Sequence, residues 1–207
     1  MKVFNPPQDK KELPLRKKLG WKREIIIIST RSWENIYGIE TLLKAFRIIT
    51  LAEPNVRIIM LGGGSLSGII DKHIAKYEMD RIINRPGVVE NSGLAEYFKC
   101  ADIYISCSLT DGSSISLLEA MASGLPVVVS DIPGNREWVS DGVNGFLAET
   151  GSGEAFAAGV RKLLAMSENE RSEMGLRNQK LAEDRADWDK NFNKLMDLYQ
   201  SFGTKAE

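Results

Sequence analysis

Short runs of consecutive apolar residues alternate with amphipathic segments along most of this chain. Such runs predict strands that are buried on both faces, and they occur at residues 25–28, 56–61, 103–105 and 127–129. The amphipathic segments have the period of a helix, with apolar stripes at Ile39, Leu42, Leu43, Phe46 and Ile49, at Phe156, Val160, Leu163 and Leu164, and at Trp188, Phe192, Leu195, Met196 and Tyr199. The alternation predicts an α/β fold, Rossmann-like, with three α/β/α layers and a parallel sheet.

Composition and charge place the chain among ordinary globular proteins. Its 207 residues are 43% hydrophobic and 27% charged, and the formal net charge of -1 gives no reason to expect a nucleic-acid partner. No segment has the length of a membrane span or the form of a signal peptide. We expect Cys100 and Cys107 to be buried free thiols, which favours a reducing, cytoplasmic location.

Three segments are expected along the chain. Residues 1–24 are rich in Lys and Arg, carry Pro6 and Pro7, and predict a connecting segment with a short helix. Residues 25–185 predict one Rossmann-like domain, and residues 186–207 predict an amphipathic C-terminal helix.

Two carboxylates lie around the predicted start of a helix after the third predicted strand. Asp111 and Gly112 precede Ser113, Ser114, Ile115 and Ser116, and a helix is predicted over residues 117–122. The first backbone N–H groups of a helix have no partner inside it, so this segment favours the binding of an anion such as a diphosphate. Glu119 lies in the first turns. A simpler interpretation makes Ser116 and Glu119 a capping box, in which Glu119 only reaches back to a backbone N–H.

The residues that follow this helix favour a ligand site over a cap alone. Gly124 ends the helix, Pro126 precedes the strand at residues 127–129, and a polar turn follows at residues 131–134. The helix therefore lies between two loops at one edge of the sheet. In an open parallel sheet, ligands bind at the carboxyl ends of the strands.

A glycine-rich turn, Gly62, Gly63 and Gly64, follows the second predicted strand. No G-x-G-x-x-G spacing runs through it, and the next strand offers no acidic residue for a ribose 2′-hydroxyl, which argues against a dehydrogenase. We expect a loop that allows close backbone approach; the alternative is a simple turn from strand to helix.

A metal site has little support in the sequence. Asp187-Trp188-Asp189 matches an Asp-x-Asp pattern, but it opens the predicted C-terminal helix, where Asp is favoured as the N-cap. His73 is the only histidine, and no Cys/His ligand spacing is present. We therefore predict no metal and no cofactor.

The segment from Asp111 to Gly145 resembles the retaining glycosyltransferases of the GT-B fold, family 4, which include glycogen synthase-like and mannosyltransferase-like enzymes. Their signature has two glutamates with seven residues between them, a helix like 117–122, a Gly-x-Pro-Val-Val strand as at 124–128, and a Gly-x-x-Glu turn as at Gly134 and Glu137. Gly142 and Gly145 take the place of the closing glycines. Asp111 departs from the pattern, because the family usually has Glu there.

The resemblance implies roles for individual residues. Arg31 and the amides of Ser113, Ser114, Ile115 and Ser116 would hold the donor diphosphate, Asp111 and Gly112 the donor sugar, and Glu119 the ribose, with Asp111 and Glu119 as the catalytic acids. Residues Gly87, Val88 and Val89 would border the base, and Gly62, Gly63, Gly64, Gly134 and Glu137 would support the loops. The lysine that the family places near Arg31 is absent, since Tyr37 precedes Gly38. Loss of that cation would cost donor binding roughly 1.5–3 kcal/mol.

Resemblance also implies a reaction and a missing half. The chain would be the C-terminal half of a GT-B fold, and the sequence from Lys2 to Pro6 resembles the connection between the two halves. It would bind a nucleoside diphosphate sugar and transfer the sugar with retention, only together with an N-terminal acceptor domain or subunit, and any peripheral membrane association would come through that half. Two alternatives stay open: a stand-alone nucleotide-binding or regulatory module that pairs with a separate subunit, and a GT-B sugar-nucleotide epimerase.

Overall fold

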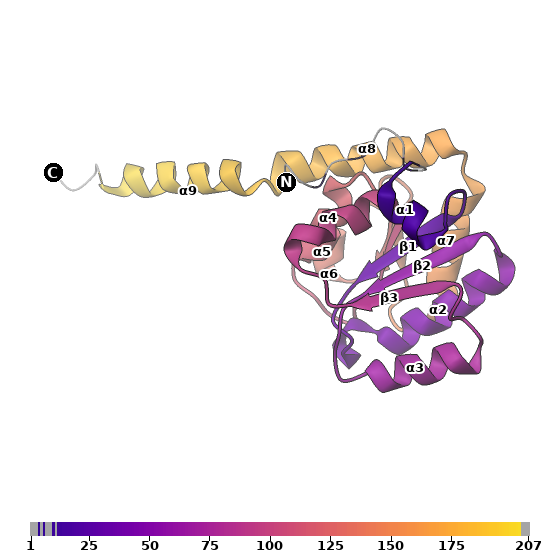
Figure 1. Ribbon diagram of the computed structural model, residues 1–207. Helices are drawn as coiled ribbons and strands as arrows, with labels where there is room; N and C mark the ends of the chain where they lie inside the picture. Colours follow the sequence, from indigo (N-terminus) through magenta and orange to yellow (C-terminus); the bar gives the residue numbers. More distant parts are fainter. Residues whose placement is uncertain (1–3, 5, 7–9, 11, 204–207) are drawn as a thin grey trace.

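The computed structural model describes residues 4, 6, 10 and 12–203 of the chain. One sheet of parallel strands has the order β3-β2-β1-β4-β5-β6. Its first three strands are labelled in Figure 1. The strands are β1 (Ile25–Thr30), β2 (Val56–Leu61), β3 (Ile83–Gly87), β4 (Ile103–Ser106), β5 (Val127–Ser130) and β6 (Gly145–Ala148). The predicted α/β fold with a parallel sheet is confirmed.

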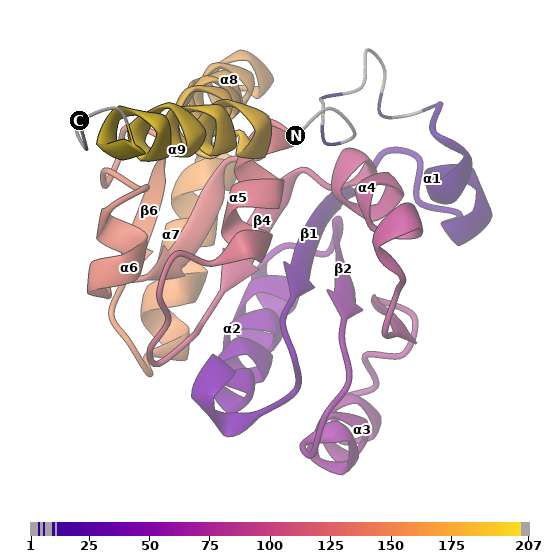
Figure 2. The same ribbon diagram turned by 90° about the vertical axis from the view of Figure 1, so that its left-hand side faces the viewer.

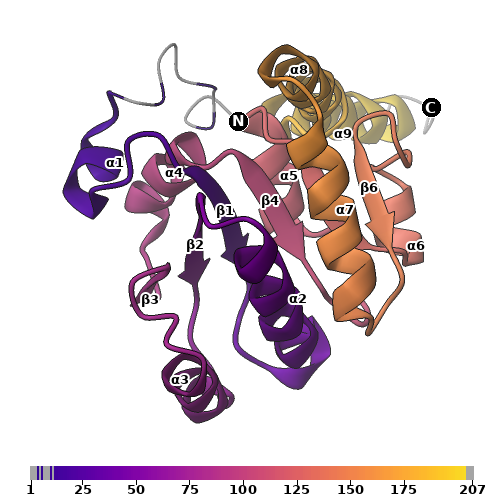
Figure 3. The same cartoon turned by 90° about the vertical axis from the view of Figure 1, so that its right-hand side faces the viewer.

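Helices cover both faces of this sheet. Helices α4 (Asn91–Cys100), α5 (Ile115–Ala122) and α8 (Glu168–Arg185) lie on one face (Figure 2). Helices α2 (Ile39–Ala52), α3 (Ser67–Lys76) and α7 (Gly153–Ala165) lie on the other, where α2 and α7 run side by side (Figure 3). The three predicted layers are present.

The consecutive isoleucines of β1 show why the strands are continuously apolar. Ile26 and Ile28 point into the core beneath α4 and α5, whereas Ile27 points into the core beneath α2 and α7. All three side chains are fully buried. A strand that is covered on both faces must be apolar at every position, so the pattern lacks the alternation of a half-exposed strand.

The two edge strands, β3 and β6, were not predicted from the apolar pattern. β3 reads INRPG, and only Ile83 of its five residues is buried. Polar residues and a proline such as Pro86 are typical of an edge strand, which has no second neighbour to supply with hydrogen bonds. β6 has four residues and pairs on one side with β5.

The C-terminal part consists of two long helices in sequence. α8 begins with a capping box between Ser167 and Glu170, and α9 (Trp188–Gly203) extends away from the sheet as the outermost element (Figure 1). α9 lies within the range 186–207 in which a C-terminal helix was expected; residues 204–207 lie outside the described part. Asp187 Oδ1 accepts the backbone N–H of Lys190 at 3.0 Å, so Asp187 caps α9 as expected.

Near the other end of the chain, the short helix expected within residues 1–24 is α1 (Pro14–Leu19), which ends at Gly20. The connection expected from Lys2 to Pro6 lies largely outside the described residues, since of these only Phe4 and Pro6 are described. Cys100 and Cys107 are buried and free, as predicted. Burial raises the pKa of the Cys100 thiol to about 12, which keeps it unreactive.

Candidate functional site at the carboxyl ends of the strands

The carboxyl ends of β1 and β4 bring together residues that are far apart in the chain. Arg31 follows β1 directly, and the segment from Asp111 to Ser114 connects β4 to α5. Because β1 and β4 are neighbours in the sheet, both segments emerge at the same place. Arg31 and Asp111, 80 residues apart in sequence, form an ion pair there.

The guanidinium of Arg31 is held on three sides. One terminal nitrogen, Nη1, donates to the Ser114 hydroxyl at 2.6 Å, and the other, Nη2, pairs with Oδ2 of Asp111. The Tyr37 ring lies against the guanidinium, with Cζ 4.2 Å from the ring centroid. Nε is buried and has no hydrogen-bond partner. Ten per cent of the Arg31 side chain is exposed, so the cation is fixed but still reachable.

The start of α5 faces this cation. Ser114 is the N-cap and accepts the amide of Leu117 at 3.4 Å, so the helix begins two residues before the predicted range. The amides of Ile115 and Ser116 precede the first intrahelical bond and are available to an anion. Ser116 Oγ donates to the Thr30 carbonyl at 3.2 Å and ties the helix start to β1. Because Ser114 and not Ser116 is the cap, the capping-box interpretation of Glu119 is wrong.

Glu119 lies further along α5 and carries a shifted pKa. The side chain is partly buried, and desolvation raises the pKa of its carboxyl to about 7. A carboxyl that is neither paired nor fully solvated is less stable in its charged form, so it keeps its proton to a higher pH. Perturbed groups of this kind gather at functional sites, which makes Glu119 a candidate ligand-binding residue.

A hollow of about 180 Å³ opens beside Arg31. It contains several residues that the sequence placed in the site, and it adds Leu94 and Ser32, which no motif had indicated. Its lining consists of Thr30, Arg31, Ser32, Leu61, Gly62, Gly63, Val88, Val89, Leu94 and Ser116. Gly87 precedes Val88 at the end of β3 and has a φ of 88°, a conformation that favours glycine.

The glycine-rich turn after β2 permits two loops to touch. A Cβ on Gly62 would lie 2.2 Å from the carbonyl oxygen of Arg31, and one on Gly64 would lie 2.5 Å from that of Trp33. Glu34 closes the contact, because its Oε1 accepts the Ser65 amide at 2.8 Å. The turn therefore lies directly against the backbone that carries Arg31.

A second close approach lies behind Asp111. A Cβ on Gly134, in the short helix α6 (Pro133–Arg136), would lie 2.6 Å from the Asp111 carbonyl oxygen and 2.5 Å from that of Gly112. Trp138 Nε1 donates to the Ser113 hydroxyl at 3.3 Å. The backbone carbonyl of Glu137 accepts a hydrogen bond from Nη1 of Arg185 at 3.0 Å. Sequence motifs indicated Gly134 and Glu137 but gave no signal for Trp138.

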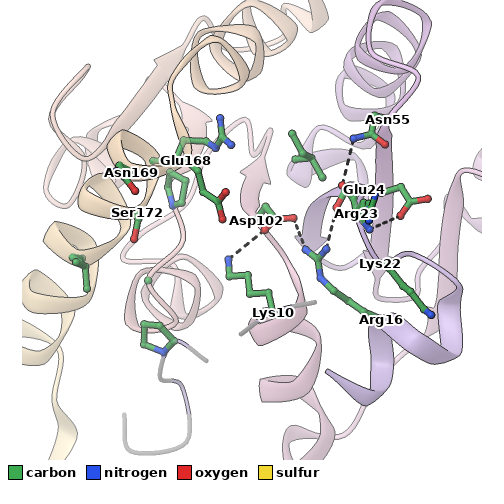
Figure 4. A pocket seen from close by; sticks show the side chains of 16 residues that line it. Lys10, Arg16, Lys22, Arg23, Glu24, Asn55, Asp102, Glu168, Asn169 and Ser172 are labelled. Carbon is green, nitrogen blue, oxygen red and sulfur yellow. Dashed lines mark hydrogen bonds and ion pairs between the residues drawn. The ribbon is translucent and has the colours of Figure 1, made fainter. Parts of the chain in front are cut away.

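A larger hollow of about 550 Å³ lies at the opposite, amino ends of the strands (Figure 4). Its buried charges already have partners within the protein. Arg16 pairs with Asp102 at 2.5 Å and donates to the carbonyls of Cys100 and Glu24, and Lys10 donates to the Ala101 carbonyl at 2.6 Å. Among the described residues, none of the buried side-chain atoms without a partner belongs to this lining. Its size alone therefore does not make it the ligand site.

Two further properties were searched for in the described part of the chain. Nowhere in it do three or more His, Cys, Asp or Glu side chains gather as they would around a metal ion. None of its helices combines the length and the apolar character needed to cross a bilayer.

The parallel sheet with helices on both faces matches the fold of the C-terminal domains of GT-B proteins. A family model described as "Glycosyl transferases group 1" matches residues 11–181, and the chain belongs to this family.

Curated relatives extend this likeness. The chain is 30% identical over 132 residues to an alpha-monoglucosyldiacylglycerol synthase of Acholeplasma laidlawii, a match that covers 63% of the chain and 33% of the relative. It is 30% identical over 155 residues to a D-inositol 3-phosphate glycosyltransferase of Paenarthrobacter aurescens, covering 72% and 37%. The chain thus spans about a third of the length of these relatives.

Solved structures share the fold at lower identity. The C-terminal domain of a glycosyl transferase group 1 family protein from Francisella tularensis matches with a TM-score of 0.80 and 19% identity, over 90% of this chain and 97% of that one. Anabaena Alr3699/HepE in complex with UDP-glucose matches with a TM-score of 0.85 and 18% identity, over 97% of this chain and 55% of that one.

Proposed function

We propose that this chain is the donor-binding domain of a glycosyltransferase that takes a sugar from a nucleoside diphosphate sugar. The observation that carries the proposal is the position of Arg31 against the first turn of α5. A guanidinium and free helix amides together offer the hydrogen bonds and positive charge that a diphosphate requires. UDP-sugars are the first donors to test, since Anabaena Alr3699/HepE, a structure with the same fold, was solved with UDP-glucose.

Each part of the donor is assigned to one group of residues. Arg31 and the segment 113–116 hold the diphosphate, Glu119 holds the ribose hydroxyls, and Asp111 with Gly112 meets the sugar. The exposed Val88, with Gly87 and Val89, borders the base. Close contacts at Gly62, Gly64 and Gly134 keep the loops in place.

The reaction follows from where charge develops. As the bond between sugar and diphosphate breaks, negative charge grows on the departing diphosphate. Arg31 and the amides of Ile115 and Ser116 stabilise that charge more strongly than they stabilise the intact donor, which lowers the barrier. Transfer with retention of configuration and without a metal ion is part of the proposal, as is the cytoplasmic location that free thiols favour.

Transfer is proposed to need an acceptor domain beyond this chain. The two relatives described above are about three times as long as the matched part, and an acceptor requires a surface opposite the carboxyl ends of the strands. The isolated chain is therefore expected to bind donor but to transfer little or no sugar.

Calorimetry with UDP-, GDP- and ADP-sugars tests the binding. We expect one nucleotide class to bind weakly, and Glu119→Ala to lose roughly 1.5–3 kcal/mol of binding free energy if Glu119 bonds the ribose. Arg23→Ala is a control for a remote substitution, because Arg23 is exposed and lines the hollow at the far end of the sheet.

Three outcomes would contradict the proposal in different ways. If no UDP-, GDP- or ADP-sugar binds, the chain has no donor site. Unchanged affinity in Glu119→Ala removes the ribose role. Conversion of a nucleotide sugar without any acceptor, followed by NMR, would favour an epimerase instead.

A further inference from the structure

Both terminal nitrogens of the Arg31 guanidinium already donate a hydrogen bond, and its Nε is buried. Nη1 is taken by the Ser114 hydroxyl and Nη2 by the Asp111 carboxylate, while the Tyr37 ring covers one face. Each terminal nitrogen keeps a second N–H, so a diphosphate can reach the guanidinium, but it then lies next to the Asp111 carboxylate. Two anions this close repel each other, and binding at this site therefore favours an exchange of partners.

The charge of the site identifies which partner leaves. Within the described part of the chain, Arg31 is the only charged residue that lines the small hollow, and Tyr37 stands where the resemblance expects a second cation. Asp111 neutralises that single cation. Ser114 and Tyr37 are uncharged and can remain in contact while a diphosphate, which carries more negative charge than one carboxylate, takes over the guanidinium.

We propose that Asp111 is an internal counter-ion of Arg31, which the donor diphosphate displaces and thereby frees to accept a hydrogen bond from the donor sugar. The inference rests on the proposed function. Tyr37 and Ser114 are positioning residues that hold the guanidinium while its anionic partner changes. Gly134 packs against the Asp111 and Gly112 carbonyls, so the backbone stays in place and the exchange involves the Asp111 side chain.

This exchange couples recognition of the two halves of the donor. Until a diphosphate is bound, Arg31 holds Oδ2 of Asp111, so the ion pair and not the sugar sets the position of the carboxylate. The coupling is reciprocal, because a sugar that holds Asp111 away from Arg31 also favours the diphosphate. The site thus selects an intact nucleoside diphosphate sugar over either of its parts.

Calorimetry with inorganic pyrophosphate, UDP and UDP-glucose on the 207-residue chain tests the exchange. Asp111→Asn removes the competing charge and keeps the size of the side chain. We expect it to bind pyrophosphate and UDP about three- to tenfold more tightly than the wild type, as expected for loss of a partly exposed ion pair. The preference of UDP-glucose over UDP should fall in the same variant, since the sugar loses its charged acceptor.

Two control variants test whether the effect on binding is specific to the charge of Asp111. Asp71→Asn removes the acid of another Arg–Asp pair, Asp71 with Arg85 on the surface, and should leave all three affinities unchanged. Asp111→Glu keeps the charge and should not tighten pyrophosphate binding. Thermal melting of each variant confirms that it is folded.

The affinities of the variants distinguish a failure of the counter-ion inference from a failure of the proposed donor binding. If Arg31→Ala weakens pyrophosphate binding while Asp111→Asn binds no more tightly than the wild type, the donor site stands and the counter-ion inference is overturned. If the tighter binding is found but UDP-glucose keeps its full preference over UDP, the release of Asp111 to the sugar is overturned. If pyrophosphate and the nucleotides bind to no variant, the proposed function fails as well.

Discussion

At the amino ends of the strands, the side chains of Arg16 and Asp102 form an ion pair that also bonds backbone groups. At the carboxyl ends, the hydrogen bonds of the Arg31 and Asp111 side chains within the described residues go to side chains alone. Arg16 donates to two carbonyls, and Asp102 accepts the Ile26 amide at 2.8 Å. The first pair therefore holds α1, α4 and β1 together, and a ligand could not replace it without loosening the fold. The second can change partners at little cost to the fold, which is what a binding site requires.

The largest expected effect on stability is that of Asp102→Asn, which tests whether the Arg16–Asp102 pair holds the fold together. It would leave Arg16, whose side chain is 3% exposed, without its counter-ion. Removing one partner of a buried pair costs about 3–5 kcal/mol, and the partial exposure of Asp102 places the expected loss of unfolding free energy near the lower value, about 3 kcal/mol. Urea unfolding measures it, with Asp71→Asn as a control that should change stability by less than about 0.5 kcal/mol. A loss below about 1 kcal/mol would make the two pairs alike.

Arg31→Ala is expected to show the opposite profile. It should weaken binding of a nucleoside diphosphate by about 2 kcal/mol, or roughly thirtyfold, because a charge-assisted hydrogen bond is lost. Its unfolding free energy should change by under about 1 kcal/mol, since no backbone group depends on Arg31. Calorimetry measures the loss of binding, and urea unfolding of the same sample measures the change in stability. Equal binding in wild type and variant would remove Arg31 from the site.

Much of this arrangement could be predicted from the sequence, and the limits have physical causes. The strands β1, β2, β4 and β5 are covered on both faces and so carry a clear apolar run. The edge strand β3 is mostly exposed, and β6 is largely buried but has only four residues, two of them Gly145 and Ala148. Arg31 was assigned to the ligand by the family resemblance, and Asp111 by its place before the predicted helix and by the same resemblance. That they bind one another depends on β1 and β4 being neighbours in the sheet, and no local pattern contains that information.

The same limit explains the residues that the motifs missed. Leu94 reaches the small hollow from α4, and Trp138 reaches Ser113 from beyond α6. Both contacts arise from packing between segments that are distant in sequence. Tyr37 was noticed only as the absence of a lysine, and its position against the guanidinium gives that absence a structural meaning.

The pKa of Glu119 predicts that the free energy of unfolding depends on pH, because this carboxyl is partly buried at the candidate site. Burial raises its pKa from 4.5 to about 7, so below pH 4.5 the carboxyl is neutral in both the folded and the unfolded chain and costs nothing. Between pH 4.5 and 7 the unfolded chain releases this proton first, so stability falls as pH rises, and above pH 7 the loss is complete.

We therefore expect Glu119→Gln to be more stable than the wild type at pH 8 by roughly 1.5 kcal/mol, about half the value of the full shift because the group is partly solvated. The difference should vanish at pH 4. Urea unfolding at several pH values measures it. A constant difference across this range would show that Glu119 is not desolvated.

The smallest expected effect concerns how firmly the carboxyl-end loop is held from behind. Trp138→Phe keeps a ring beneath the Arg185 guanidinium, which lies 4.7 Å from the ring centroid, but removes the N–H that bonds the Ser113 hydroxyl. Loss of one partly buried hydrogen bond should weaken nucleoside diphosphate binding by about 0.5–1 kcal/mol, because the amides that follow Ser113 are then less rigidly placed. Trp188→Phe, on the exposed side of α9, is the matched control and should leave affinity unchanged.

A double-mutant cycle with Ser113→Ala shows whether the two residues act through this bond. If they do, the second substitution should add almost nothing to the first, because the interaction is already lost. Losses that simply add would mean that Trp138 supports the loop through packing alone. In that case the carboxyl-end loop would be held by the Gly134 contact, and the contrast with the backbone-bound pair at the amino ends would rest on Arg31 and Asp111 themselves.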